Sequence, residues 1–176
     1  MTLFNKKFRV ESTRLKDHDY SSVGDYYVTI CVGVDYGLFG SVEDGVMCLN
    51  GAGETAKQIW EKLPVDFNNI SLGDFVIMPD HMHGVINIVK QSNKTLFDMV
   101  GAFKSKSSKD IGIATGIKWG EVWQRGFYDR IIRDEYEYYF VSEYIKNNPL
   151  KTDPDNYYKE WYELIEVREK QDKDKE

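Results

Sequence analysis

The order of strand-like and helix-like segments limits this chain to few folds. Four segments rich in β-branched and aromatic residues lie at 26–34, 70–78, 81–89 and 127–133. Apolar residues recur at helical spacing over 53–63 and 96–110, after the first and the third of these strands. This β-α-β-β-α-β order predicts an α+β fold, a ferredoxin-like sandwich with an antiparallel sheet and additional C-terminal helices.

Capping residues indicate where the helices begin and end. Pro64 is expected to stop the first helix, and Thr95 with Asp98 forms a partial capping box at the start of the second. Asp134 is a good N-cap for a third helix that runs to about residue 146. A short strand is expected at 46–49, a loop between the second helix and Trp123, and a further helix around 155–168.

Length and composition predict one globular domain that spans residues 1–176. Residues 1–24 are expected to form an N-terminal arm, and the charged residues 169–176 a frayed tail.

The chain shows neither a signal-peptide core nor an apolar run near the ~18–20 residues of a membrane span, so we expect a cytoplasmic protein. Cys31 and Cys48 lack the CxxC spacing and are expected to be buried, reduced thiols.

The net charge of -6 argues against non-specific binding of nucleic acid by the chain as a whole. The charge is unevenly distributed, however. Residues 91–151 carry ten Lys and Arg against eight Asp and Glu, a net of +2, whereas residues 1–90 and 152–176 each carry -4.

Two of the three histidines, His81 and His83, lie one residue apart in the predicted strand at 81–89. Residues i and i+2 of a strand point to the same face, so the pair supplies half of a metal site. A catalytic divalent metal needs at least one more protein ligand, which must come from a distant Asp, Glu, Asn or Gln. Two satisfied histidines beside a turn are the alternative.

The third predicted helix brings Tyr144 and Asn148 to one face, because they are spaced i, i+4. An amide oxygen ligates hard cations, and a tyrosine one turn away is a candidate covalent nucleophile toward a phosphodiester. With 12 tyrosines in the chain, ordinary packing is the alternative for Tyr144, and a helix C-cap is the alternative for Asn148.

A block from Trp123 to Arg133 interleaves aromatic and basic residues. This composition suits the stacked bases and phosphates of a single strand, and the helix before it ends in a basic face. An ordinary strand whose polar face carries arginines is the alternative. The candidate DNA contacts are Lys104, Lys106, Trp123, Gln124, Arg125, Tyr128, Arg130 and Arg133.

Three blocks occur in a specific order: Met-Pro-Asp-His-Met-His-Gly, Val-Trp-Gln-Arg-Gly-Phe-Tyr-Asp-Arg-Ile-Ile-Arg-Asp-Glu, and Glu-Tyr-Ile-Lys-Asn-Asn-Pro-Leu-Lys. Together with Asp-Tyr-Ser-Ser at residues 19–22, they resemble the REP-associated tyrosine transposases of the HUH (His-hydrophobic-His) endonuclease superfamily. The resemblance spans roughly residues 17–155. It implies the same ferredoxin-like fold.

The resemblance also implies an activity. His81 and His83 match the metal-binding histidines, Asn148 the third ligand, and Tyr144 the nucleophile that forms a 5′-phosphotyrosine and frees a 3′-OH. The implied cofactor is Mg²⁺ or Mn²⁺, and the implied substrate is single-stranded DNA near a hairpin. Relatives act as monomers or as dimers with shared sites, so a homodimer stays open. Two other functions stay open as well, a domesticated protein that binds hairpins without cutting and a hydrolase of small phosphodiesters.

Overall fold

A four-stranded antiparallel sheet is the centre of the molecule. In the computed structural model, which describes residues 3–4, 8–9, 17–34 and 37–150, the strand order is β6-β7-β3-β8. These strands span Gly24–Cys31 (β3), Ile70–Ile77 (β6), His81–Ile88 (β7) and Tyr128–Ile132 (β8). Every neighbouring pair is antiparallel, so the ferredoxin-like prediction is confirmed. The predicted helix at 155–168 and the charged tail lie outside the described residues.

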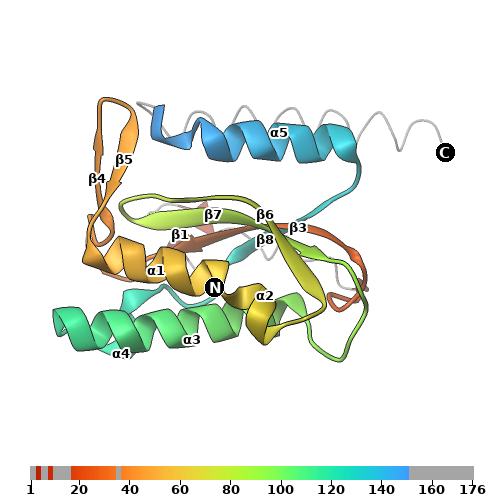
Figure 1. Ribbon diagram of the computed structural model, residues 1–176, viewed down its shortest axis with the longest axis horizontal. Coiled ribbons are helices and arrows are strands. Elements are labelled where there is room, and N and C mark those ends of the chain that lie inside the picture. The colour runs from red at the N-terminus through yellow and green to blue at the C-terminus, as the bar shows by residue number, and fades with distance from the viewer. Residues whose placement is uncertain (1–2, 5–7, 10–16, 35–36, 151–176) are drawn as a thin grey trace.

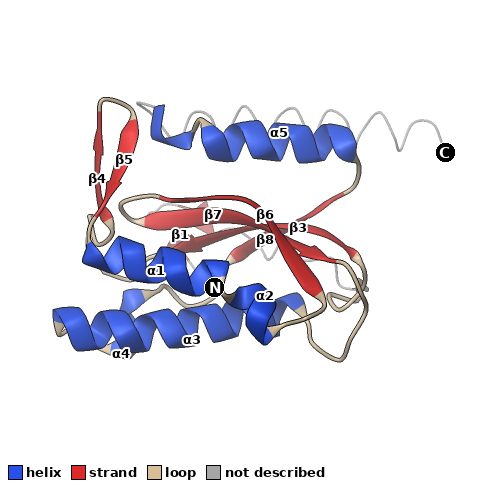
Figure 2. Ribbon diagram, in the orientation of Figure 1, coloured by secondary structure: helices blue, strands red, loops and turns tan. Residues whose placement is uncertain are grey.

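Helices cover both faces of this sheet (Figure 1). Helices α1 (Gly51–Glu61), α2 (Leu63–Asp66), α3 (Leu96–Thr115) and α4 (Trp119–Val122) lie on one side. Among the described helices of the chain, α5 (Glu135–Lys146) is the one on the other side, followed by a 3₁₀ turn at Asn148–Leu150 (Figure 2). Because side chains alternate along a strand, β3 sends Tyr26, Val28 and Ile30 into one core and Tyr27 into the other.

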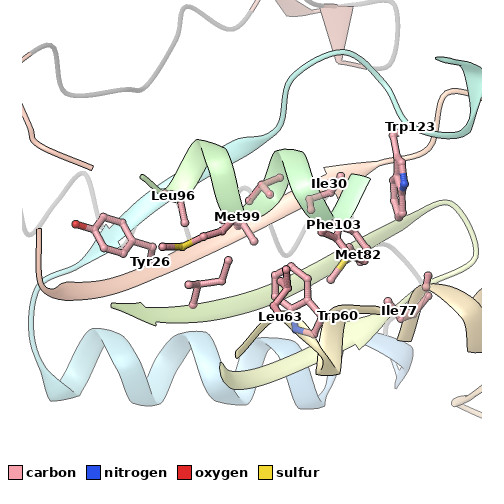
Figure 3. Close-up of a cluster of buried hydrophobic side chains, with 14 of the residues drawn as sticks. Tyr26, Ile30, Trp60, Leu63, Ile77, Met82, Leu96, Met99, Phe103 and Trp123 are labelled. Atoms are coloured by element: carbon pink, nitrogen blue, oxygen red, sulfur yellow. The ribbon is translucent and has the colours of Figure 1, made fainter. Parts of the chain in front are cut away.

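The larger core lies between the sheet and α1 and α3 (Figure 3). Trp60 of α1, Phe103 of α3 and Met82 of β7 are fully buried there. A Cβ atom at Gly84 would approach the Trp60 ring to 2.5 Å, so the residue after the second histidine must be glycine for this helix to pack closely. The histidine strand is therefore fixed from the face opposite its histidines.

The main differences from the prediction are one helix end, one short helix and one strand. Helix α3 runs to Thr115 rather than to residue 110, because Ile111 is buried in the core and Gly112 lies closely under the Trp119 ring. The predicted loop before Trp123 contains α4. A strand that was not predicted, β4 (Gly40–Glu43), pairs with β5 (Val46–Leu49) across a two-residue turn in which both residues have positive φ.

Short strands β1 (Leu3–Phe4) and β2 (Phe8–Arg9) pair with each other in the predicted N-terminal arm. Among the described residues, no helix has the length and apolar content needed to cross a membrane.

The capping box at the start of α3 is confirmed. Thr95 accepts a hydrogen bond from the Asp98 backbone N–H, and the Asp98 carboxylate accepts from the Thr95 N–H at 2.8 Å.

We predict that Thr95→Ala lowers the free energy of unfolding by about 0.5–2 kcal/mol, because it exposes an unsatisfied helix N-terminus. Urea denaturation followed by circular dichroism measures the change. Thr55→Ala, inside α1, is the control and should stay within about 0.5 kcal/mol of the parent; equal losses in both variants would contradict the capping role.

Candidate active site

The two histidines lie at the start of β7 on the sheet face that α5 covers. Their rings are in edge contact, with centroids 4.7 Å apart. His83 is buried, whereas the His81 side chain is 16% exposed. The prediction that the pair shares one face of a central strand is confirmed, and the site lies where the sheet meets the β6–β7 turn.

Asp80, the last residue of that turn, holds His81 from one side. Its carboxylate Oδ1 lies 2.7 Å from His81 Nδ1. A carboxylate at this distance accepts a hydrogen bond from Nδ1–H, so the lone pair of a neutral imidazole is left on Nε2. This is the arrangement in which a histidine serves as a metal ligand through Nε2.

His83 is held by two hydroxyl groups from the neighbouring strand β3. Its Nδ1 lies 2.7 Å from Tyr27 Oη and 2.9 Å from Thr29 Oγ1. Thr29 is directly opposite His83 in the register of the two strands, and all three residues are buried. The opposite ring nitrogen, Nε2, faces α5.

Tyr144 reaches His83 from α5. Its Oη lies 3.3 Å from His83 Nε2, and the two rings are in edge contact with centroids 5.0 Å apart. Val141 and Ile145 pack beside Tyr144 against Tyr27, which fixes this face of the helix on the sheet. A phenol and an imidazole 61 residues apart in the sequence therefore form one buried pair.

Asn148 begins the 3₁₀ turn that follows α5, one helical turn after Tyr144. Its side chain is buried, yet neither Oδ1 nor Nδ2 has a hydrogen-bond partner among the described residues. Leaving a buried polar atom unsatisfied costs about 1–3 kcal/mol. An amide kept in this state is expected to gain a partner from a ligand.

The described residues contain no group of three or more His, Cys, Asp or Glu side chains that could hold a metal ion. A third protein ligand beside the two imidazoles would thus have to be another kind of oxygen, such as a side-chain amide or a backbone carbonyl. Asn148 is the buried amide with a free oxygen, and its residue type fits a hard divalent cation.

Trp123 is a correction to the predicted DNA contacts. Its ring is buried between Phe39 and Phe103, and its Nε1 donates to Ser107 Oγ at 2.9 Å. The ring is part of the main core and has no free face for stacking on a base.

The two predicted lysines of α3 make contacts within the protein. Lys104 Nζ donates to the backbone carbonyls of Gln124 and Gly126, and burial lowers its pKa. Lys106 pairs with Asp66 at the end of α2. Lys104 thus orders the loop that presents Gln124 and Arg125, and both of these side chains are exposed.

The remaining predicted contacts lie on or beside β8. Arg130 pairs with Glu137 of α5 at 3.2 Å, with both side chains largely buried, so its observed role is to hold α5 on the sheet. Arg133 donates its backbone N–H to the same carboxylate, and its side chain is exposed. Tyr128 is half-buried and is paired with Thr29 in the strand register.

Sequence reasoning missed Asp80, Tyr27 and Thr29. Asp80 had a local signal, because it immediately precedes the first histidine. Tyr27 and Thr29 also alternate at i and i+2 on a strand, but only the pairing of β3 with β7 shows that they face His83.

Residues 49–148 match the family model described as "Transposase IS200 like". The chain belongs to this family of transposases. The matched segment includes both histidines and Tyr144, and it ends at Asn148.

Two relatives place this transposase among known proteins. An uncharacterized protein of Haemophilus influenzae is 34% identical over 171 residues, which cover 84% of this chain and 92% of the relative. The solved structure of a REP-associated tyrosine transposase bound to a REP hairpin superposes with a TM-score of 0.58, at 19% identity, over 78% of this chain and 73% of the other. The similarity to this solved structure supports the fold of the chain.

The two cysteines differ in environment. Cys31, opposite His81 in the register, is half-buried, and burial with the nearby Asp80 charge raises its pKa to about 12. Cys48 is exposed, which corrects the prediction that both thiols are buried, and both are free as predicted.

We predict that a chromogenic thiol reagent at pH 8 modifies one cysteine rapidly, because Cys31 stays protonated below about pH 12 whereas Cys48 is accessible. Cys48→Ser should abolish the fast phase, and Cys31→Ser should leave it unchanged. A fast phase that disappears with Cys31→Ser instead would contradict this assignment.

Proposed function

We propose that this transposase is a metal-dependent endonuclease and strand transferase, which cuts single-stranded DNA near hairpin repeats through a 5′-phosphotyrosine. The observation that carries the proposal is the 3.3 Å approach of Tyr144 Oη to His83 Nε2. A buried phenol needs a hydrogen-bond partner in any case, but this partner is one of the two candidate metal ligands, so the phenol oxygen lies where a bound phosphodiester would meet the cation.

In the proposed reaction, Tyr144 is the nucleophile. Its oxygen attacks the phosphorus of a phosphodiester, and the phenolic proton leaves to water, because the single lone pair of His83 Nε2 would be taken up by the cation described below. The P–O3′ bond breaks, and the leaving oxygen takes up a proton to become a 3′-OH. The downstream strand then stays on Tyr144 by its 5′-phosphate, and attack by a 3′-OH reverses the step and joins strands.

His81, His83 and Asn148 would hold the Mg²⁺ or Mn²⁺ ion. Three features support this fit: Asp80 at His81 Nδ1, the hydroxyl groups at His83 Nδ1, and the unpaired amide of Asn148. When bound, such a cation neutralises negative charge on a phosphate oxygen.

Hairpin DNA is the proposed substrate because of the fold shared with a transposase that was solved on a REP hairpin. In this chain, Gln124, Arg125 and Arg133 are predicted contacts with exposed side chains, and Lys106 is exposed as well although it pairs with Asp66. They lie on the segment with net positive charge, where they would meet the DNA backbone.

We predict that Tyr144→Phe abolishes the covalent adduct that wild-type protein forms with hairpin single-stranded DNA and Mg²⁺ or Mn²⁺, because the variant lacks the attacking oxygen. Denaturing gel electrophoresis with DNA labelled on the 3′ side of the cut measures the adduct. Tyr139→Phe, on the exposed side of α5, is the matched control and should retain it.

Three results would contradict this function. An adduct that survives in Tyr144→Phe would exclude Tyr144 as the nucleophile. Salt-dependent hairpin binding without cleavage would favour the non-cutting binding protein. Hydrolysis of a small phosphodiester that persists in Tyr144→Phe would favour a metallohydrolase.

Tyr144 and His83 of the same chain are in contact, so we propose that each chain forms a complete site. Mixing Tyr144→Phe protein with His83→Ala protein is expected to give no adduct, because each variant lacks one half of its own pair. Gel electrophoresis of the mixture with labelled hairpin DNA tests this. Recovery of the adduct would mean that a second chain supplies the tyrosine.

A further inference from the structure

We propose that Tyr27 and Thr29 are positioning residues that keep the imidazole proton of His83 on Nδ1 and so present an unprotonated Nε2 to the site. The tautomer itself follows from local contacts. Its consequence for metal binding rests on the proposed function.

Three polar atoms form a closed triangle beside His83. Nδ1 lies 2.7 Å from Tyr27 Oη and 2.9 Å from Thr29 Oγ1, and Thr29 Oγ1 donates to Tyr27 Oη at 3.1 Å. Each distance is short enough for a hydrogen bond, so the triangle restricts where the protons lie.

A proton on Nδ1 makes all three contacts attractive. Nδ1–H donates to Thr29 Oγ1 and is shared with Tyr27 Oη, while the Thr29 hydroxyl donates to Tyr27. A proton on Nε2 leaves a lone pair on Nδ1. Tyr27 could donate to that lone pair, but the Thr29 oxygen, whose proton points at Tyr27, would face it at 2.9 Å and repel it. The triangle therefore selects the Nδ1–H form.

Burial and register make this selection effective. Tyr27, Thr29 and His83 are each at most 3% exposed, so water cannot readily replace a lost contact. Thr29 pairs directly with His83, and Tyr27 lies two residues along the same strand and the same face. The positions of all three depend on rigid backbone pairing rather than on a loop.

The tautomer of His83 determines whether Nε2, on the other side of the ring, carries a lone pair or a proton. With the proton on Nδ1, Nε2 accepts a hydrogen bond from Tyr144 Oη, and a cation that bound Nε2 would take the place of this hydrogen bond. The two tyrosines beside His83 thus have different roles. Tyr144 contacts the nitrogen that faces the reaction, whereas Tyr27 contacts the nitrogen that orients the ring.

Nitrogen NMR of the metal-free protein without DNA tests the proposal directly. The protonated and unprotonated nitrogens of a neutral imidazole resonate at well-separated shifts, so the spectrum of the neutral ring reports its tautomer. The wild type should carry the proton on Nδ1. Thr29→Val and Tyr27→Phe should each shift the population toward Nε2–H, and Thr29→Ser, which keeps the oxygen, should restore the wild-type spectrum.

Tyr26→Phe is the matched control. It removes one hydroxyl group from the same strand, but this group contacts Ser22 and His18 and lies on the opposite face. Its His83 signals should match those of the wild type. A wild-type protein with the proton on Nε2, or a spectrum unchanged in both Thr29→Val and Tyr27→Phe, would overturn the proposal.

Calorimetric titration with Mn²⁺ measures the consequence. Second-layer partners of a metal-bound histidine are typically worth 10–100-fold in affinity, so Thr29→Val should weaken Mn²⁺ binding by about that factor and Thr29→Ser should recover it. Unchanged affinity in Thr29→Val would overturn the link to the metal. A wild type with the predicted tautomer that forms no adduct on hairpin DNA would contradict the proposed function and still support the positioning role.

Discussion

Packing of α5 against the second face of the sheet is the interaction on which the candidate site depends. The face of α5 that meets the sheet buries Val141, Tyr144 and Ile145, and Tyr138 packs partly buried beside them. Each buried side chain of this size contributes about 1.5–3 kcal/mol, so the helix is held by a modest apolar contact. The Arg130–Glu137 pair adds a largely buried ion pair at the start of the helix. Without this docking, His83 Nε2 would have no phenol beside it.

The fold could be predicted because its signals are local. Alternation identified the strands of the sheet, and the caps at Thr95 and Asp134 identified two helix starts. The predictions were wrong where contacts between distant residues determine the length of a helix or the burial of a side chain. Helix α3 continues past residue 110 because Ile111 finds a place in the core, and Trp123 is buried because Ser107 accepts its indole N–H. An aromatic residue among arginines has the same composition whether it stacks on a base or fills a core.

The site was predictable only in part, for the same reason. His81 and His83 lie within one strand, so their shared face follows from strand geometry, whereas Asn148 lies in the 3₁₀ turn after the helix that carries Tyr144. The contacts of Tyr27 and Thr29 with His83 span 56 and 54 residues. They require the register between β3 and β7, and a shift of one residue would turn both hydroxyl groups to the other face.

The electrostatics of the site explain why an acidic chain would need a cation for the proposed chemistry. The hydroxyl groups that contact His83 come from Tyr27, Thr29 and Tyr144, which are neutral groups in a buried setting. Arg130, in register with Tyr27 on the same face, already pairs with Glu137. A phosphodiester at Tyr144 would bring negative charge into this environment at considerable cost in free energy. Neutral imidazole and amide ligands leave the full charge of a divalent cation available to offset it, which is the physical reason to expect the metal at His81, His83 and Asn148 rather than a basic side chain.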